Sequence, residues 1–153
     1  MVSWKYAVTG FLLLLSLLVT TQTLQSQQYA TATSGQVTPV FSGPETIPGT
    51  HGVCGEYFVQ PFNGTTGEVL NGTVNASSAV DVYVTTSTVY KAWQHQVVAG
   101  GDCTPSSLIA SQKNTTAYTL KTIIPTTGTY DLIVNNLSEK TVTTQINVNL
   151  IET

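Results

Sequence analysis

The C-terminal half of the chain alternates between apolar and polar residues. Between residues 141 and 150 one set of alternate positions is Val142, Thr144, Ile146, Val148 and Leu150, and the positions between them are Thr, Gln or Asn. Side chains of a β-strand point alternately to its two faces, so this period of two predicts a strand with one face on a core. The same reasoning predicts strands at 56–59, 80–84, 118–124 and 130–134.

Short clusters of Gly, Pro, Asn and Asp separate these runs and predict turns at 62–64, 70–72, 100–102 and 125–128. Short strands at this spacing are typical of an all-β fold, and we expect an antiparallel β-sandwich of the jelly-roll or immunoglobulin-like kind.

One segment has helical spacing instead. Residues 87–94 begin with a capping hydroxyl at Ser87, and Val89, Ala92 and Trp93 recur as on one face of a helix. We expect a single short helix over one end of the sandwich, with Trp93 sealing the core.

The first 32 residues predict export. A basic start with Lys5 precedes an apolar block at 11–19, and the small residues Ala30 and Ala32 form a pattern that a signal peptidase accepts. A hydrophobic helix over 6–19 would rise about 21 Å, less than the roughly 30 Å hydrocarbon core, which favours a removed signal peptide. Ala32 lies unusually far from the apolar block, so an uncleaved N-terminal membrane anchor is the alternative.

About 120 residues follow, enough for one domain. The expected organisation is 1–32 as signal peptide or anchor, 33–52 as a Thr/Pro/Gly-rich linker or donor strand, and 53–153 as the β-sandwich domain.

Charge is scarce. Only 8% of the residues are charged, against a usual share near 25%, and the net charge is -3. The five basic residues form no cluster, so no nucleic acid partner is expected. Hydroxyl and amide hydrogen bonds persist at low pH, where ion pairs are lost, so an acidophile's cell surface is the expected habitat.

Three features together resemble a known group of domains. They are the strand Val82-Tyr83-Val84, the pair Tyr90-x-x-Trp93, and the segment from Pro125 through G-T-Y-D-L-I-V-N-N at 128–136. This succession, followed by the polar-alternating last strand, resembles the emp24/GOLD-like and pre-peptidase C-terminal-like β-sandwich domains of secreted archaeal cell-surface proteins. The resemblance covers residues 80–150. It implies a binding, accessory or structural module and supplies no catalytic residues.

The two cysteines lie outside that resemblance. Cys54 and Cys103 of an exported chain are expected to form a disulfide. A metal site that adds His51 and His95 is disfavoured because it lacks a second closely spaced ligand pair, so no metal or other cofactor is expected.

Five acceptor sequons predict N-glycosylation in turns or near strand ends. They are Asn63, Asn71, Asn75, Asn114 and Asn136.

The residue inventory favours a protein that is not an enzyme. Neither His51 nor His95 accompanies a nucleophile motif such as G-x-S-x-G, and the carboxylates are scattered, so no catalytic residues are assigned. A secreted enzyme or a carbohydrate-binding module is the lesser alternative.

Two hypotheses remain, and they differ in the role of residues 21–42. In one, this segment is a stalk that holds an extracellular module near other cell-envelope proteins, anchored to the membrane if the N-terminus is uncleaved. In the other, it is a donor strand that completes the sheet of the next copy and builds a filament. A virion envelope protein would look the same.

Overall fold

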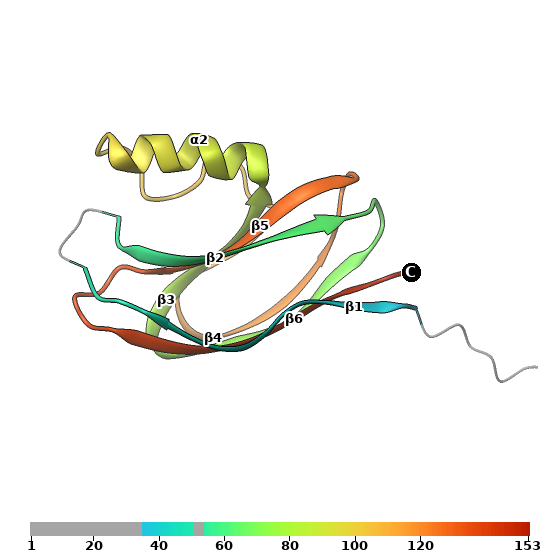
Figure 1. Cartoon of the computed structure of the whole chain (residues 1–153), viewed down its shortest axis with the longest axis horizontal. Helices are drawn as coiled ribbons and strands as arrows, with labels where there is room; N and C mark the ends of the chain where they lie inside the picture. The colour runs from blue at the N-terminus through green and yellow to red at the C-terminus, as the bar shows by residue number, and fades with distance from the viewer. Residues whose placement is uncertain (1–34, 51–53) are drawn as a thin grey trace, which may run out of the picture. The chain divides into compact units, whose positions relative to one another are not determined.

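The computed structural model describes residues 35–50 and 54–153 of the chain. This part forms six strands and one helix (Figure 1). Their order along the chain is β1 (Val37–Ile47), β2 (Glu56–Gly64), β3 (Val69–Thr86), α2 (Ser87–Val98), β4 (Ala110–Ile123), β5 (Gly128–Asn136) and β6 (Val142–Ile151).

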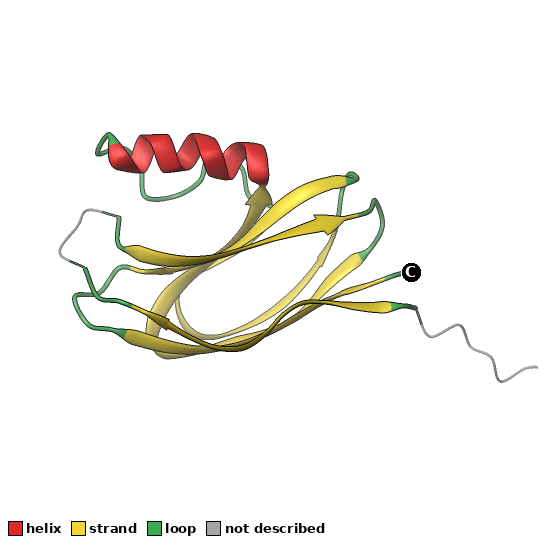
Figure 2. Cartoon of the chain, viewed as in Figure 1, coloured by secondary structure: helices red, strands yellow, loops and turns green. Residues whose placement is uncertain are grey.

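All strand pairs are antiparallel and belong to one sheet. Its order is β1-β6-β3-β5-β2, and β4 pairs with the remaining edge of β3. The first half of β3 pairs with β6 and its second half with β5. Because β4 follows β3 through both halves, the sheet curls into two layers that share these two strands (Figure 2).

The bend has a local cause. The register between β3 and β4 shifts between Asn75 and Val82, and Asn114 of β4 has a positive φ of 53°. Bulges of this kind increase twist and turn a strand from one layer to the other. The Asp81 carboxylate accepts a hydrogen bond of 2.7 Å from the Asn114 backbone N–H and so fixes the bulge.

The predicted antiparallel β-fold with one short helix is confirmed. The two layers are parts of one curled sheet, whereas a sandwich has two separate sheets. Across the open side of the curl, Phe41 of β1 meets Phe58 of β2 with ring centroids 5.0 Å apart.

Most of the core fills the inside of the curl. Leu70, Val82, Leu132 and Ile146 are fully buried there. A smaller cluster on the outer side joins Tyr83, Ile133 and Trp93, so β5 is buried on both faces.

The structure of segment 33–52 differs from the prediction. Residues 37–47 form β1, which pairs with β6 of the same chain, and the compact unit begins at residue 35. In this structure β1 is therefore a strand of the chain's own sheet and not a linker, and the domain starts before residue 53. The sequence pattern did not predict this strand because it contains Pro39 and Pro44. An edge strand tolerates residues that lack an N–H.

The predicted turn at 70–72 is wrong. Leu70, Asn71 and Gly72 lie inside β3, with β4 on one side and β6 on the other. A Cβ at Gly72 would lie 2.1 Å from the carbonyl oxygen of Asn147, so this glycine allows close strand approach and makes no turn. Residues 62–64 are likewise the end of β2, and the chain turns just after them.

The helix is longer than predicted and its cap lies one residue earlier. It runs to Val98, and the N-cap is Thr86, whose hydroxyl accepts a hydrogen bond from the Val89 N–H. The N-terminal hydrophobic helix and the 1–32 segment lie outside the described residues. No helix in the described ranges is long and apolar enough to span a membrane.

Candidate functional site

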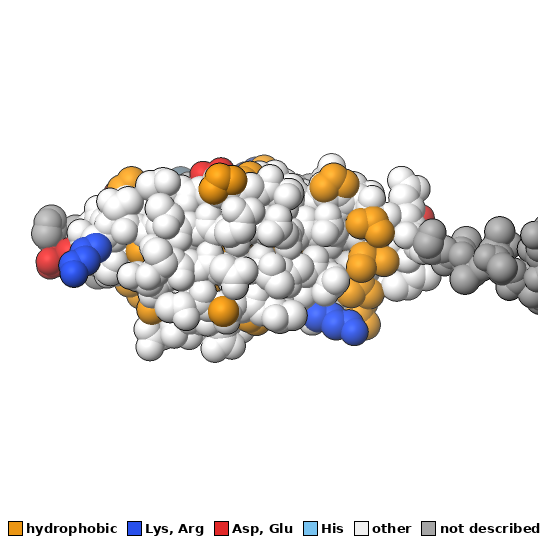
Figure 3. Space-filling view, turned by 90° about the horizontal axis from the view of Figure 1, so that it is seen from below, with side chains coloured by type: hydrophobic (Ala, Val, Ile, Leu, Met, Phe, Trp, Pro, Cys, Tyr) orange, Lys and Arg blue, Asp and Glu red, His pale blue; other side chains and the backbone are white. Residues whose placement is uncertain are grey.

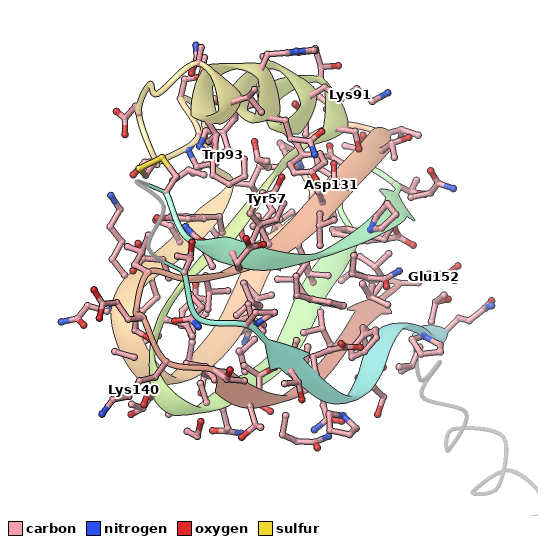
Figure 4. All side chains as sticks on the ribbon, turned by 60° about the vertical axis from the view of Figure 1, so that its left-hand side comes forward. Tyr57, Lys91, Trp93, Asp131, Lys140 and Glu152 are labelled. Carbon is pink, nitrogen blue, oxygen red and sulfur yellow. A yellow bond between two sulfur atoms is a disulfide. The ribbon has the colours of Figure 1, made fainter. Side chains whose placement is uncertain are left out.

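Helix α2 lies on the outer face of the layer formed by β2, β5 and the second half of β3. Trp93 is its anchor: the side chain is 1% exposed, packs 5.2 Å from the ring of Tyr57 and donates a hydrogen bond from Nε1 to the carbonyl of Asp102. Gln94 Nε2 also donates to the Tyr57 hydroxyl, at 3.2 Å. Figure 4 shows Trp93 and Tyr57 on the sheet side of the helix.

The predicted disulfide is confirmed. Cys54 and Cys103 are bonded, with their Cα atoms 4.8 Å apart. The bond joins the start of β2 to the loop that follows α2, and no cysteine in the described residues is free. It therefore holds the C-terminal side of the helix against the sheet.

A polar pair is buried on the same outer face. Tyr83 is fully buried and its hydroxyl donates to Asp81 at 2.7 Å. Burial raises the pKa of the Tyr83 phenol above its ordinary value, and the hydrogen bond to Asp81 raises it further. With its bond to Asn114, Asp81 has two donors and serves the structure.

A pocket opens at the other end of the helix, beside its first turn. Its volume is about 460 Å³, within the range of about 300–1,000 Å³ common for small-molecule sites. The lining comes from β2, α2 and β5: Pro61, Ser87, Thr88, Tyr90, Lys91, Thr129 and Asp131. In Figure 4, Lys91 and Asp131 lie toward this end of α2.

Asp131 is the distinctive residue of this pocket. Its side chain is 3% exposed, and its Oδ2 atom has no hydrogen-bond partner in the described structure. In the sheet Asp131 faces Pro61 on one side, which has no N–H, and Thr85 on the other. Ser87 Oγ is a second buried atom without a hydrogen-bond partner in the described structure.

The pocket has one acidic residue at its buried end and one basic residue at its rim. Asp131 supplies a buried negative charge, and the exposed Lys91 supplies a positive charge at the rim. Burial raises the pKa of the Tyr90 phenol above its ordinary value, the neighbouring Tyr57 adds to the rise, and the Asp131 carboxylate contributes the least. Tyr90 therefore stays a neutral hydroxyl and aromatic surface at the pocket wall.

A second pocket lies far from the helix, around residues 65–68 and the C-terminal residues Glu152 and Thr153. It has no buried polar atom without a partner among its lining residues. The face of the molecule seen in Figure 3 has few Lys, Asp or Glu side chains, and hydrophobic side chains gather toward one end of it. The pocket beside α2 is therefore the stronger candidate site.

The glycosylation residues fall into two groups. The side chains of Asn63, Asn75 and Asn114 are exposed, and that of Asn71 is partly exposed inside β3. Glycosylation at these four positions stays a prediction.

The position of Asn136 does not fit the prediction that it carries a glycan. It is fully buried, its Nδ2 donates to the carbonyls of Pro48 and Lys140, and its Oδ1 accepts from Ser138. A glycan on Nδ2 would break these bonds and has no room, so Asn136 is a structural residue of the folded chain.

The ligands of the alternative metal site are not available in the described residues. Both cysteines are in the disulfide, His51 lies outside the described residues, and the described ranges hold no group of three metal-ligating side chains.

Sequence reasoning missed Asp131 as a site residue. Asp131 was expected only as a polar position in the alternating strand 130–134. The available signal was a carboxylate between Tyr130 and Leu132 in a run that continues as Ile133 and Val134, since such a run predicts a strand buried on both faces.

Comparisons with known proteins add little. No model of a known protein family matches the chain, and no curated protein matches it. Among solved structures, the chain is similar to a periplasmic inhibitor of g-type lysozyme from Aeromonas hydrophila. The identity is 13% and the TM-score 0.46, over 78% of this chain and 90% of that chain. A likeness at this level carries no argument about function.

Proposed function

We propose that this protein is exported and acts at the cell surface as a non-enzymatic interaction module. The disulfide between Cys54 and Cys103 is the observation that carries the proposal, because such bonds persist in oxidising compartments outside the cytoplasm. The signal-like segment at 1–32 and the exposed sequon residues point the same way. The strand pattern that resembles surface domains of archaea supports an archaeal host.

The pocket beside α2 supports an interaction role. An unpaired buried carboxylate oxygen costs stability unless something binds it, and such costs concentrate at functional sites. The Asp131 pocket is thus the surface at which a partner or ligand is expected to bind.

Peptide mapping of the native protein tests this proposal. The protein is recovered from separated surface and cytosolic fractions of its host and digested without reduction. We expect it in the surface fraction, with a Cys54–Cys103 cross-linked peptide that disappears on reduction, and with glycan mass on peptides containing Asn63, Asn75 or Asn114. A cytosolic protein with two free thiols would refute the proposal.

Assembly into a filament is a second candidate, favoured by the position of β1. This strand is at the edge of the sheet, hydrogen-bonds only to β6 and has its N-terminal half largely exposed. The same segment of another copy can take its place in the same register. In the surface fraction, large denaturant-resistant particles would support strand exchange, and a protein of monomer size would contradict it.

A further inference from the structure

We propose that one end of the sheet contacts a lipid bilayer through a row of exposed aliphatic side chains. The row crosses the outer face of the layer formed by β1, β6, the first half of β3 and β4. This inference rests on the surface location in the proposed function and adds a second partner, away from the pocket beside α2. It depends on three observations: the aliphatic row, a face without carboxylates, and the point where the chain enters the domain.

The aliphatic row has one residue from each of four neighbouring strands. In register across the sheet, these residues are Val37 of β1, Ile151 of β6, Val69 of β3 and Ile123 of β4. Residues directly opposite each other share a face, and the next pair, Leu70 and Leu150, is buried in the core. The row therefore points outward. Val37 is 57% and Ile123 64% exposed, and hydrophobic side chains gather at one end of the face in Figure 3.

The face behind the row has no acidic side chain among its described residues. Its other paired positions are Thr, Ser, Asn, Gln, Pro or Ala, and Lys121 is their only charged residue. Glu68 and Glu152 adjoin the row in sequence, but both line the second pocket, on the other face of their strands. Aliphatic groups beside neutral hydroxyls, amides and one lysine suit the headgroup region of a bilayer with some anionic lipid.

The chain enters the described domain at this end. The compact unit begins at Gly35, two residues before Val37. The apolar block at 11–19 is joined to Gly35 by residues 20–34, which can span at most about 55 Å. If the block is retained as an anchor, Val37 cannot lie further than that from the bilayer.

The size of the row favours a bilayer over a second copy. Stable protein interfaces bury about 800 Å² on each partner. Four aliphatic side chains, two of them partly covered, offer on the order of a few hundred Å². Membrane binding grows with the apolar area inserted and is reversible when that area is small. The row is thus expected to bind lipid weakly alone and to add to an anchor.

Paramagnetic lipids locate the contact. The chain from Thr33 is produced with its disulfide in a host that adds no glycans, and it contains the whole compact unit. Its ¹⁵N-labelled form is mixed with bicelles of phosphatidylcholine and phosphatidylglycerol that carry a doxyl-labelled lipid. We expect selective broadening of the amides around the aliphatic row, and none over α2.

Substitutions assign the contact to the row, with partition into vesicles of the same lipids measured by co-sedimentation. Val37→Ser with Ile123→Ser is expected to lower the partition coefficient about tenfold or more. Val98→Ser is the matched control, because Val98 is also exposed but lies on α2, and it is expected to change nothing. Lys121→Gln is expected to weaken partition about fivefold with phosphatidylglycerol present and little without it.

The proposal is overturned if the doxyl lipid broadens no amides or those of α2, or if the double variant partitions as the original protein does. Row amides that shift on dilution without lipid would assign the row to a second copy. Row amides that differ between this chain and one starting at residue 20 would assign it to the N-terminal segment. Both results also overturn the proposal. None of these readouts depends on the location of the native protein in its host, so the proposed function is tested separately.

Discussion

Replacing both cysteines, as Cys54→Ser with Cys103→Ser, is expected to lower the free energy of unfolding by about 4 kcal/mol. The bond spans 49 residues, and closing a loop of this length removes about that much chain entropy from the unfolded state. Typical single domains are stable by only about 5–15 kcal/mol, so most of the margin can disappear. Urea unfolding followed by circular dichroism measures the change.

Reduction of the unmodified protein is the matched control. Unfolding in the presence of a reductant is expected to give the same loss, because it removes the bond and leaves both side chains in place. A loss below about 1 kcal/mol by both routes would show that the bond adds little to the fold.

Trp93→Ala is expected to lower the free energy of unfolding by about 3–5 kcal/mol, the usual cost of truncating a fully buried aromatic. Trp93 is 1% exposed, and its removal also breaks the bond to the Asp102 carbonyl and the ring contact with Tyr57. The curled sheet has a separate core, so α2 is expected to loosen before the strands do. Hydrogen exchange of the α2 amides measures this local loss.

Val98→Ala controls for a change on the same helix. Val98 is 90% exposed, so its truncation is expected to change stability by less than about 0.5 kcal/mol. Equal protection of the α2 amides in Trp93→Ala and the original protein would contradict an anchoring role for Trp93.

The strands with clean alternation were predictable from sequence. In β6 every second residue from Val142 to Leu150 is buried, as the pattern requires. β1 was missed because its two prolines look like a linker, and only pairing with β6 reveals an edge strand. β3 was predicted too short because Asn71 and Gly72 resemble a turn, whereas the glycine is needed where two strands approach closely.

The site was less predictable than the fold. The disulfide followed from the count of cysteines in a chain that was expected to be exported. The Asp131 pocket depends on how β2, α2 and β5 meet, and residues as distant as Pro61, Lys91 and Asp131 show no common pattern in the sequence. Asn136 failed as a glycan acceptor for the same reason, since its burial arises from contacts with Pro48 and Lys140.

Two buried aspartates differ in how many hydrogen bonds their carboxylates accept. Asp81 and Asp131 lie on the same outer face, but Asp81 accepts two hydrogen bonds, whereas Asp131 has an oxygen with none. A carboxylate kept for binding should reduce stability, and a carboxylate kept for structure should add to it.

The decisive measurement is the free energy of unfolding of Asp131→Asn beside Asp81→Asn, without added ligand. Asp131→Asn is expected to be more stable than the original protein by about 1 kcal/mol or more, because a neutral amide costs less to bury than an unpaired carboxylate. Asp81→Asn is expected to lose about 1–3 kcal/mol, because one of its donors then faces an amide N–H. A loss of stability in Asp131→Asn equal to that in Asp81→Asn would show that Asp131 serves the fold and not a ligand.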